Sequence, residues 1–319
     1  LIDLKRYLKE FNLPINNYNF IEHHLGHAAS AFYTSHFDEA VIVTIDGIGD
    51  NCSWAIFHGE NGRLQKLLSQ PAPNSIGYIY LLFTLWLGFG GQGNEGKTMG
   101  LASYGESRYV DQVLNNIISF DITKNEIIMN EKRLEYFGSY TYIEEQFGAA
   151  RKFDDEITQY HKDIAASIQS ATEIIISCII DCALSMVSTD NICIAGGVAL
   201  NCVATGKYIK KHPEKNVYVP PFACDTGISV GAVLYQYAIE ERKKPLNKIS
   251  KWFSPYQGYE ITNNEIESAI VNYPTLIAEK IENPEKMAAQ EIANGNVVGW
   301  VQGRAEVGPR ALGNRSILA

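Results

Sequence analysis

Two histidines and two aspartates have the spacing and context of a metal site. His23 and His27 lie four residues apart, so a helix would carry both imidazoles on one face. Asp46 ends a β-branched run, and Asp225 lies in a loop between a predicted strand and a predicted helix. Because strand ends gather ligands in α/β sheets, we expect these side chains to converge. Such a donor set suits iron, manganese or zinc rather than calcium. A zinc-peptidase motif is excluded, since His24 stands where that motif needs glutamate.

A second signal is the segment at residues 91–98, which matches the P-loop expression Gly-x4-Gly-Lys-Thr in full. A P-loop needs a strand before it and an uninterrupted helix after it. Here a helical pattern precedes the segment, and Gly100 and Gly105 interrupt the residues after it. The context therefore disfavours a P-loop.

Two further segments could bind anions. At residues 195–201 a predicted strand runs into two glycines at a helix start, where a ligand can approach backbone amides closely. Residues 302–316 carry Arg304, Arg310 and Arg315 among glycines. Three guanidinium groups so close together offer phosphate or carboxylate a forked clamp.

The elements that must position these side chains form an alternating α/β pattern. We predict helices at residues 1–11, 27–33, 76–87, 164–186, 198–209 and 228–242. We predict strands at residues 41–45, 52–57, 191–195, 217–219 and 297–301. Residues 106–160 carry no recognisable motif, and we interpret them as a solvated surface, with a substrate-facing insertion as the alternative. A compositional break at residues 243–245 predicts a domain boundary.

Composition sets the broad class of the protein. The 319 residues predict about two domains, and 46% hydrophobic residues is typical of a globular chain. A net charge of −9 argues against coating nucleic acid, although one nucleotide could still bind. The most apolar run, residues 76–89, is shorter than the ~20 residues that a bilayer requires. Six cysteines without a Cys-x-x-Cys pair favour a reducing cytoplasm. The first residue is not methionine and the last residues are apolar, so we expect a fragment.

Together these motifs resemble the carbamoyltransferase family that includes nodulation protein NodU and antibiotic O-carbamoyltransferases. The resemblance rests on seven blocks in the family's order, at residues 23–30, 46–47, 75–77, 95–105, 196–201, 224–227 and 303–318. It also explains the P-loop-like segment at residues 91–98, because Lys97 belongs to the family's own motif at residues 95–105.

The resemblance implies an α/β fold in two parts. Residues 1–245 would form an actin/sugar-kinase-like (ribonuclease H-like) carbamoyl-transfer body that lacks its first strands. Residues 246–319 would begin a YrdC-like domain, here truncated. The YrdC-like part of the family converts ATP and carbamoyl phosphate to carbamoyladenylate. The first part then moves the carbamoyl group to a hydroxyl of a sugar or secondary-metabolite acceptor.

The resemblance also implies roles for individual residues. The metal ligands would be His23, His27, Asp46 and Asp225, with iron favoured and manganese or zinc as alternatives. The histidines and Lys97 would be the catalytic groups. Gly77, Gly197 and Asn201 would hold the adenylate, and Asp46 and Gly47 would also bind the cofactor. The YrdC-like site for ATP or carbamoyl phosphate would include Arg304, Arg310, Arg315 and Ser316.

The remaining expectations concern partners and competing functions. We expect a small-molecule hydroxyl acceptor, no nucleic acid and no membrane, and we leave a homodimer open. Two other functions stay open: an ATP-dependent kinase or ATPase of the same superfold, and a non-catalytic nucleotide-binding fragment. Binding of a metal by His23 and His27 in the absence of nucleotide would argue against the kinase or ATPase alternative.

Overall fold

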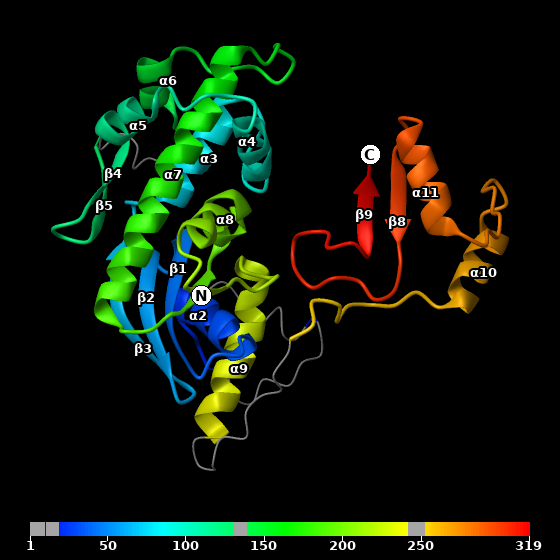
Figure 1. The fold of residues 1–319 in the computed structure, drawn as a ribbon, viewed down its shortest axis with the longest axis horizontal. Helices are drawn as coiled ribbons and strands as arrows, with labels where there is room; N and C mark the ends of the chain where they lie inside the picture. Colours follow the sequence, from blue (N-terminus) through cyan, green and yellow to red (C-terminus); the bar gives the residue numbers. More distant parts are fainter. Residues whose placement is uncertain (1–9, 11–18, 131–138, 242–252) are drawn as a thin grey trace.

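A continuous β-branched run forms the central strand of the fold. The computed structural model describes residues 10, 19–130, 139–241 and 253–319. The strands of the main sheet are β1 (Glu39–Gly49), β2 (Cys52–Glu60), β3 (Arg63–Pro71), β6 (Asn191–Ala195) and β7 (Asn216–Tyr218). Their order is β3-β2-β1-β6-β7. Figure 1 shows β3, β2 and β1 side by side. The pairs β1–β2 and β2–β3 are antiparallel, whereas β6 runs parallel to β1 and to β7. The predicted return of the chain along residues 52–57 is confirmed, and β3 was not predicted.

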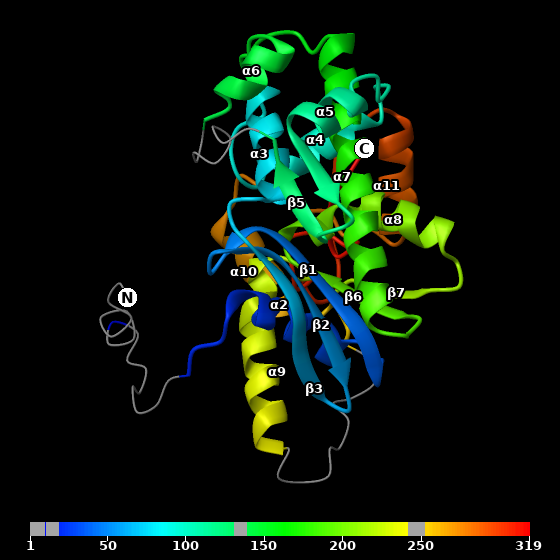
Figure 2. The ribbon, with the colours of Figure 1, turned by 90° about the vertical axis from the view of Figure 1, so that its left-hand side faces the viewer.

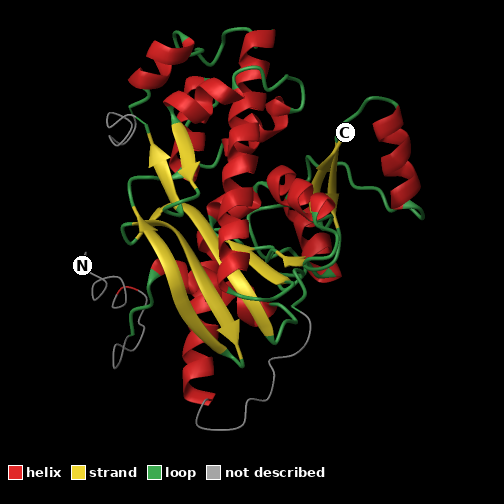
Figure 3. Ribbon diagram, turned by 60° about the vertical axis from the view of Figure 1, so that its left-hand side comes forward, coloured by secondary structure: helices red, strands yellow, loops and turns green. Residues whose placement is uncertain are grey.

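Helices cover both faces of this sheet, which is why β1 is apolar on both sides. They are α2 (His23–Thr34), α7 (Gln159–Met186) and α9 (Ile228–Glu241). Val43 and Ile45 of β1 pack in the core that includes α7. Ile42, which points to the other face, packs with Ala28 and Phe32 of α2. Figure 2 shows β1, β2 and β3 side by side with α7 passing them, and Figure 3 shows helices on both sides of the strands. The mixed α/β class is therefore confirmed.

Helix α7 is long and apolar enough, by length and composition, to cross a membrane. However, 72% of its most apolar window is buried inside the protein, as in the core helix of a globular fold. The prediction from residues 76–89 did not include this longer helix.

The prediction of a solvated surface at residues 106–160 holds only in part, because most of the described residues there are at least partly exposed but several apolar side chains are buried. This region and the residues before it form a cap of short elements around the first half of α7: α3 (Ile76–Trp86), α4 (Glu95–Ala102), α5 (Val110–Asn116), β4 (Ile118–Asp121), β5 (Glu126–Met129) and α6 (Thr141–Phe147). Val113, Ile127, Ile143 and Phe147 are buried in the same core as α3 and α7. The burial of these apolar positions could not be predicted from the sequence, because they are dispersed over short elements and none of these shows a full amphipathic period.

The predicted helix at residues 198–209 is divided in two. A 3₁₀ turn, Gly197–Leu200, precedes helix α8 (Cys202–Lys211). Asn201 separates them because its side chain accepts a hydrogen bond from the Ala204 amide and caps α8.

The C-terminal residues form a separate group of elements. They are α10 (Asn263–Asn272), α11 (Pro284–Ala293), β8 (Val298–Val301) and β9 (Arg315–Leu318), with β8 and β9 antiparallel. The predicted strand at residues 297–301 is confirmed. Among residues 253–319, only Ala288 is buried. The predicted boundary at residues 243–245 and nearly all of the predicted helix at residues 1–11 lie outside the described residues.

Candidate metal centre

The four predicted ligands converge at the carboxyl end of β1. The His23 Nε2 atom lies 2.8 Å from Asp46 Oδ2 and 3.6 Å from Asp225 Oδ1. The His27 Nε2 atom lies 3.2 Å and 3.4 Å from the same two oxygens, and the two Nε2 atoms are 3.1 Å apart. Helix α2 begins at His23 rather than at the predicted residue 27, so it includes both histidines, and it presents them on one face as their spacing predicts.

This geometry fits a divalent ion. Ligands at about 2.1 Å from an ion lie about 3.0–3.4 Å from one another at neighbouring corners of an octahedron or tetrahedron. The five separations above run from 2.8 to 3.6 Å, and all four donor atoms lie within 4.8 Å of one another. The imidazole and carboxylate donors match the first-row metals that the residue types already favoured.

The electrostatics of the cluster favour a positive charge at its centre. Burial alone would lower the pKa of His27, but hydrogen bonds with Asp225 and Asp46 outweigh burial and raise it. Burial would likewise raise the pKa of Asp46, yet the hydrogen bonds from the two histidines bring it well below its usual range. Both shifts favour a protonated His27 beside an ionised Asp46 when no metal is bound. A divalent cation would displace this proton on binding.

His24 has a structural role, although it stands between the two candidate ligands. Its side chain is fully buried, with Nδ1 2.8 Å from Thr44 Oγ1 and Nε2 3.1 Å from the carbonyl oxygen of Cys52. Burial lowers the pKa of His24 to about 4, so the ring is neutral at neutral pH. These two contacts attach α2 to β1 and β2, which fixes the face on which the other histidines point.

The carboxylate of Asp46 is oriented by backbone amides. Its Oδ1 atom accepts hydrogen bonds from the Gly47 amide at 2.7 Å and the Gly197 amide at 3.3 Å, which leaves Oδ2 to face the histidines. A Cβ at Gly77 would lie 2.8 Å from the carbonyl oxygen of Asp46. The Ser75 hydroxyl donates to the same carbonyl at 3.0 Å. Three glycines of the predicted cofactor-binding set thus surround Asp46, and that binding role stays a prediction.

A close helix crossing brings Asp225 to the histidines. Asp225 lies in the turn Asp225–Gly227, directly before α9. A Cβ at Gly231 of α9 would lie 1.9 Å from the carbonyl oxygen of Gly26 on α2. Glycine is needed here because the two helix backbones touch. The importance of Gly231 was not predicted, although an isolated glycine inside a helical pattern is the usual signal of such a contact.

The side-chain amide of Asn201 hydrogen-bonds to other residues of the protein. Besides capping α8, its Oδ1 accepts from Gln169 Nε2 at 3.0 Å, and its Nδ2 donates to Gln169 Oε1 at 2.9 Å. Tyr80 donates to the same glutamine at 2.9 Å. The predicted contact of Asn201 with the adenylate stays untested.

Lys97 lies on α4, outside the histidine–aspartate cluster, and its side chain is exposed. The segment at residues 91–98 follows helix α3 rather than a strand, so the structural context that a P-loop requires is missing.

The three C-terminal arginines contact different parts of the chain. Arg304 donates to the carbonyl oxygens of Gln257 and Gly258, and Arg315 donates to four carbonyl oxygens. The guanidinium group of Arg310 instead reaches Gly96 on α4, where a Cβ would lie 3.0 Å from its Nη2. Ser316 lies in β9, opposite Trp300 of β8. Their predicted contacts with ATP or carbamoyl phosphate stay predictions.

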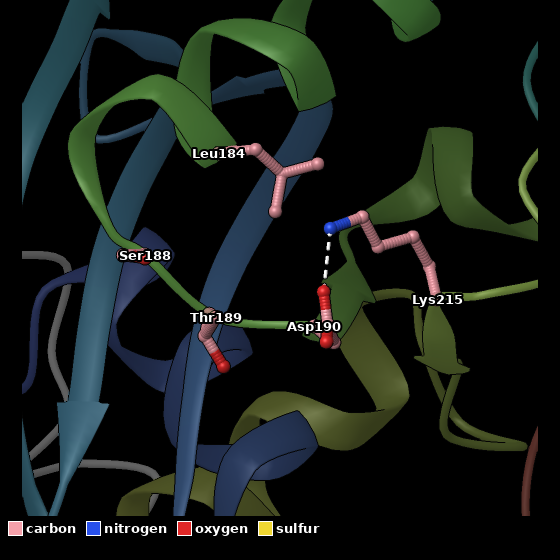
Figure 4. A pocket seen from close by; sticks show the side chains of 5 residues that line it. All are labelled: Leu184, Ser188, Thr189, Asp190 and Lys215. Carbon is pink, nitrogen blue, oxygen red and sulfur yellow. Dashed lines mark hydrogen bonds and ion pairs between the residues drawn. The ribbon is translucent and has the colours of Figure 1, made fainter.

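A small cavity of about 210 Å³ lies at the opposite end of the sheet. It is lined by Leu184, Ser188, Thr189, Asp190 and Lys215 (Figure 4). Asp190 and Lys215 form an ion pair at 2.7 Å across it. Because these residues precede β6 and β7, the cavity lies at the amino ends of the parallel strands. The metal-ligand cluster lies at the carboxyl end of β1, so the two features are separate.

Among known proteins, the chain resembles rhizobial and cyanobacterial sequences. It is 33% identical to nodulation protein NolNO of Sinorhizobium fredii, over 94% of this chain and 43% of that protein. It is 34% identical to nodulation protein NolO of Bradyrhizobium diazoefficiens, over 94% and 53%. It is 37% identical to an uncharacterized protein of Synechocystis, over 94% and 50%. The chain thus spans about half the length of these relatives.

Similar solved structures are more distant. The HypF protein of T. kodakarensis matches with a TM-score of 0.39 at 14% identity, over 76% of this chain and 39% of that chain. The activator of 2-hydroxyisocaproyl-CoA dehydratase from Clostridium difficile matches with a TM-score of 0.41 at 13% identity, over 77% and 84%.

Family profiles give the direct assignment. The profile described as "Carbamoyltransferase N-terminus" matches residues 2–234, and the one described as "Carbamoyltransferase C-terminus" matches residues 289–319. The first match covers most of the chain and includes all four residues of the metal-ligand cluster. This chain therefore belongs to the carbamoyltransferase family.

Proposed function

We propose that this chain is the transfer part of an ATP-dependent O-carbamoyltransferase. The whole protein would make carbamoyladenylate from ATP and carbamoyl phosphate, then pass the carbamoyl group to a hydroxyl of a sugar or secondary-metabolite acceptor. The transfer part would have the actin-like fold. The observation that carries the proposal is the convergence of His23, His27, Asp46 and Asp225. Family membership supports the reaction class.

The side chains of the cluster differ in their exposure to solvent. The side chain of His27 is fully buried and that of Asp46 is 14% exposed, so both are held rigidly. The side chain of Asp225 is 65% exposed, and we place the acceptor on its side. A bound iron, manganese or zinc ion would supply a Lewis acid that polarises the carbamoyl carbonyl. The chain's own contribution is to hold four donors in place and to bury one wall of the site.

The first test separates the two half-reactions in the full-length protein. His27→Ala should abolish carbamoyl transfer to the acceptor and remove the bound metal, while pyrophosphate release from ATP and carbamoyl phosphate continues. His36→Ala, an exposed histidine just beyond α2, is the matched control and should change neither readout. Full transfer activity in a folded His27→Ala variant would refute the proposed role of the cluster.

Lys97 and Arg304 give a second test, because we assign them to different steps. Lys97→Ala should leave pyrophosphate release intact and lower transfer by ~10²-fold, if the ammonium group stabilises developing charge. Arg304→Ala should suppress pyrophosphate release, while transfer from supplied carbamoyladenylate survives. Loss of pyrophosphate release in a folded Lys97→Ala variant would instead favour a P-loop.

The kinase or ATPase of the same superfold is the competing proposal. Such an enzyme holds its metal through the phosphates of the nucleotide. Equilibrium dialysis with Zn²⁺ in the absence of nucleotide separates the two. Stoichiometric binding that is lost in His27→Ala supports the carbamoyltransferase, and no binding without nucleotide supports the kinase.

A further inference from the structure

The turn between β1 and β2 lies directly against His23. It is a two-residue turn, with Gly49 paired to Cys52 and with Asp50 and Asn51 between them. Asp50 has φ 49° and Asn51 has φ 60°, the left-handed conformation that a tight type I′ hairpin requires and that Asp and Asn tolerate. The turn is therefore well defined by its own sequence.

Asp50 contacts the backbone of His23. Asp50 Oδ2 accepts a hydrogen bond from the His23 backbone amide at 2.8 Å. That amide belongs to the first turn of α2, whose N-cap residue Glu22 makes no side-chain cap. Asp50 thus caps α2 from outside the helix, and its negative charge is favourable there.

Gly49 provides the space for the His23 ring. A Cβ at Gly49 would lie 2.0 Å from His23 Cδ2, 2.3 Å from Cγ and 2.4 Å from Nε2. Those ring atoms are the three nearest atoms, so the imidazole occupies the position of the missing side chain. Gly49 lies outside the left-handed region, since its φ is not positive, and the nearest obstacle to an alanine there is the His23 ring.

We propose that Gly49 and Asp50 are positioning residues for the metal centre. Asp50 fixes the backbone of His23, and Gly49 fixes the plane of its ring, so that Nε2 meets Asp46 Oδ2 at 2.8 Å. This inference rests on the proposed metal centre. It adds two residues that act through His23 without binding the ion themselves.

The test measures Zn²⁺ affinity of the full chain by chelator competition, with the absorption spectrum of the Co²⁺ form as a report on ligand geometry. Asp50→Gly keeps the turn but removes the acceptor, and should weaken Zn²⁺ binding about 10- to 100-fold, as loss of an orienting partner does elsewhere. Asp50→Asn keeps an acceptor oxygen and should restore most of the affinity. Asn51→Gly makes the same replacement at the next turn position and should bind Zn²⁺ as the parent does.

A double-mutant cycle in urea isolates the contact between Gly49 and the ring. Gly49→Ala should lower the urea midpoint of the metal-free protein, and the effect should largely vanish when His23→Ala is also present. Parent-like Zn²⁺ affinity in both Asp50→Gly and Gly49→Ala, or an equal Gly49→Ala effect in both backgrounds, overturns the proposal. If His23→Ala itself leaves Zn²⁺ affinity unchanged, the result refutes the proposed metal centre and not only the positioning role of Gly49 and Asp50.

Discussion

Replacing Gly231 by alanine tests whether the crossing of α2 and α9 sets the geometry of the cluster. The added Cβ would lie 1.9 Å from the carbonyl oxygen of Gly26 and 2.8 Å from the amide nitrogen of Ser30. Ordinary contacts lie at about 3.5 Å, so the two backbones must separate by roughly 1.5 Å at this point. Both contacted atoms are backbone, and no side-chain rotation relieves the overlap.

Separating the two helices should displace the metal ligands directly. Gly26 precedes His27, and Asp225 lies six residues before the substituted position, in the turn that leads into the same helix. Metal sites tolerate deviations of only about 0.2 Å in ligand distance. We therefore expect Gly231→Ala to weaken Zn²⁺ binding by at least about 10-fold, the lower end of what a misplaced ligand costs. Overpacking should also destabilise the fold by about 1–3 kcal/mol.

The assay compares Gly231→Ala with Gly206→Ala by chelator competition and urea unfolding. Gly206 lies inside α8, and a Cβ there meets no atom within 4 Å. This control should bind Zn²⁺ normally and be more stable by about 0.5–1 kcal/mol, because alanine favours the helix. A Gly231→Ala protein with parent-like affinity and unfolding midpoint would falsify the crossing as the cause of the geometry.

Three other perturbations test the metal centre and two polar side chains, Arg151 and Asn201. Chelation should lower the melting temperature of the metal-loaded protein and not that of His27→Ala, since a ligand at 100 times its Kd adds about 2.7 kcal/mol of stability; differential scanning fluorimetry checks this. Arg151→Lys should destabilise the fold by about 1–3 kcal/mol in urea, because the buried guanidinium group donates to four backbone carbonyls and an ammonium group cannot reproduce that fork. Asn201→Ala should cost about 1–2 kcal/mol through the lost cap of α8, and an unchanged unfolding midpoint would contradict the structural role of this side chain.

Local patterns in the sequence were sufficient to predict several elements of the fold and site. The four-residue spacing of His23 and His27 required only a helix to place both rings on one face. The β-branched run that ends at Asp46 predicted a strand covered on both sides. The order of seven short motifs identified the family. Each of these features is a short pattern of residues close together in the chain, so residue spacing and composition were sufficient to predict it.

Which side chains meet became visible only in the folded chain. His24 has the same residue type as His23 and His27 but points into the core, where it contacts Thr44 and a backbone carbonyl oxygen. Gly49 and Gly231 matter because segments distant in the chain occupy the place of a side chain. The buried residues of 106–160 belong to the core only once α7 is in place. Contacts between distant segments depend on how helices cross and strands pair, and no local pattern in the sequence records that geometry.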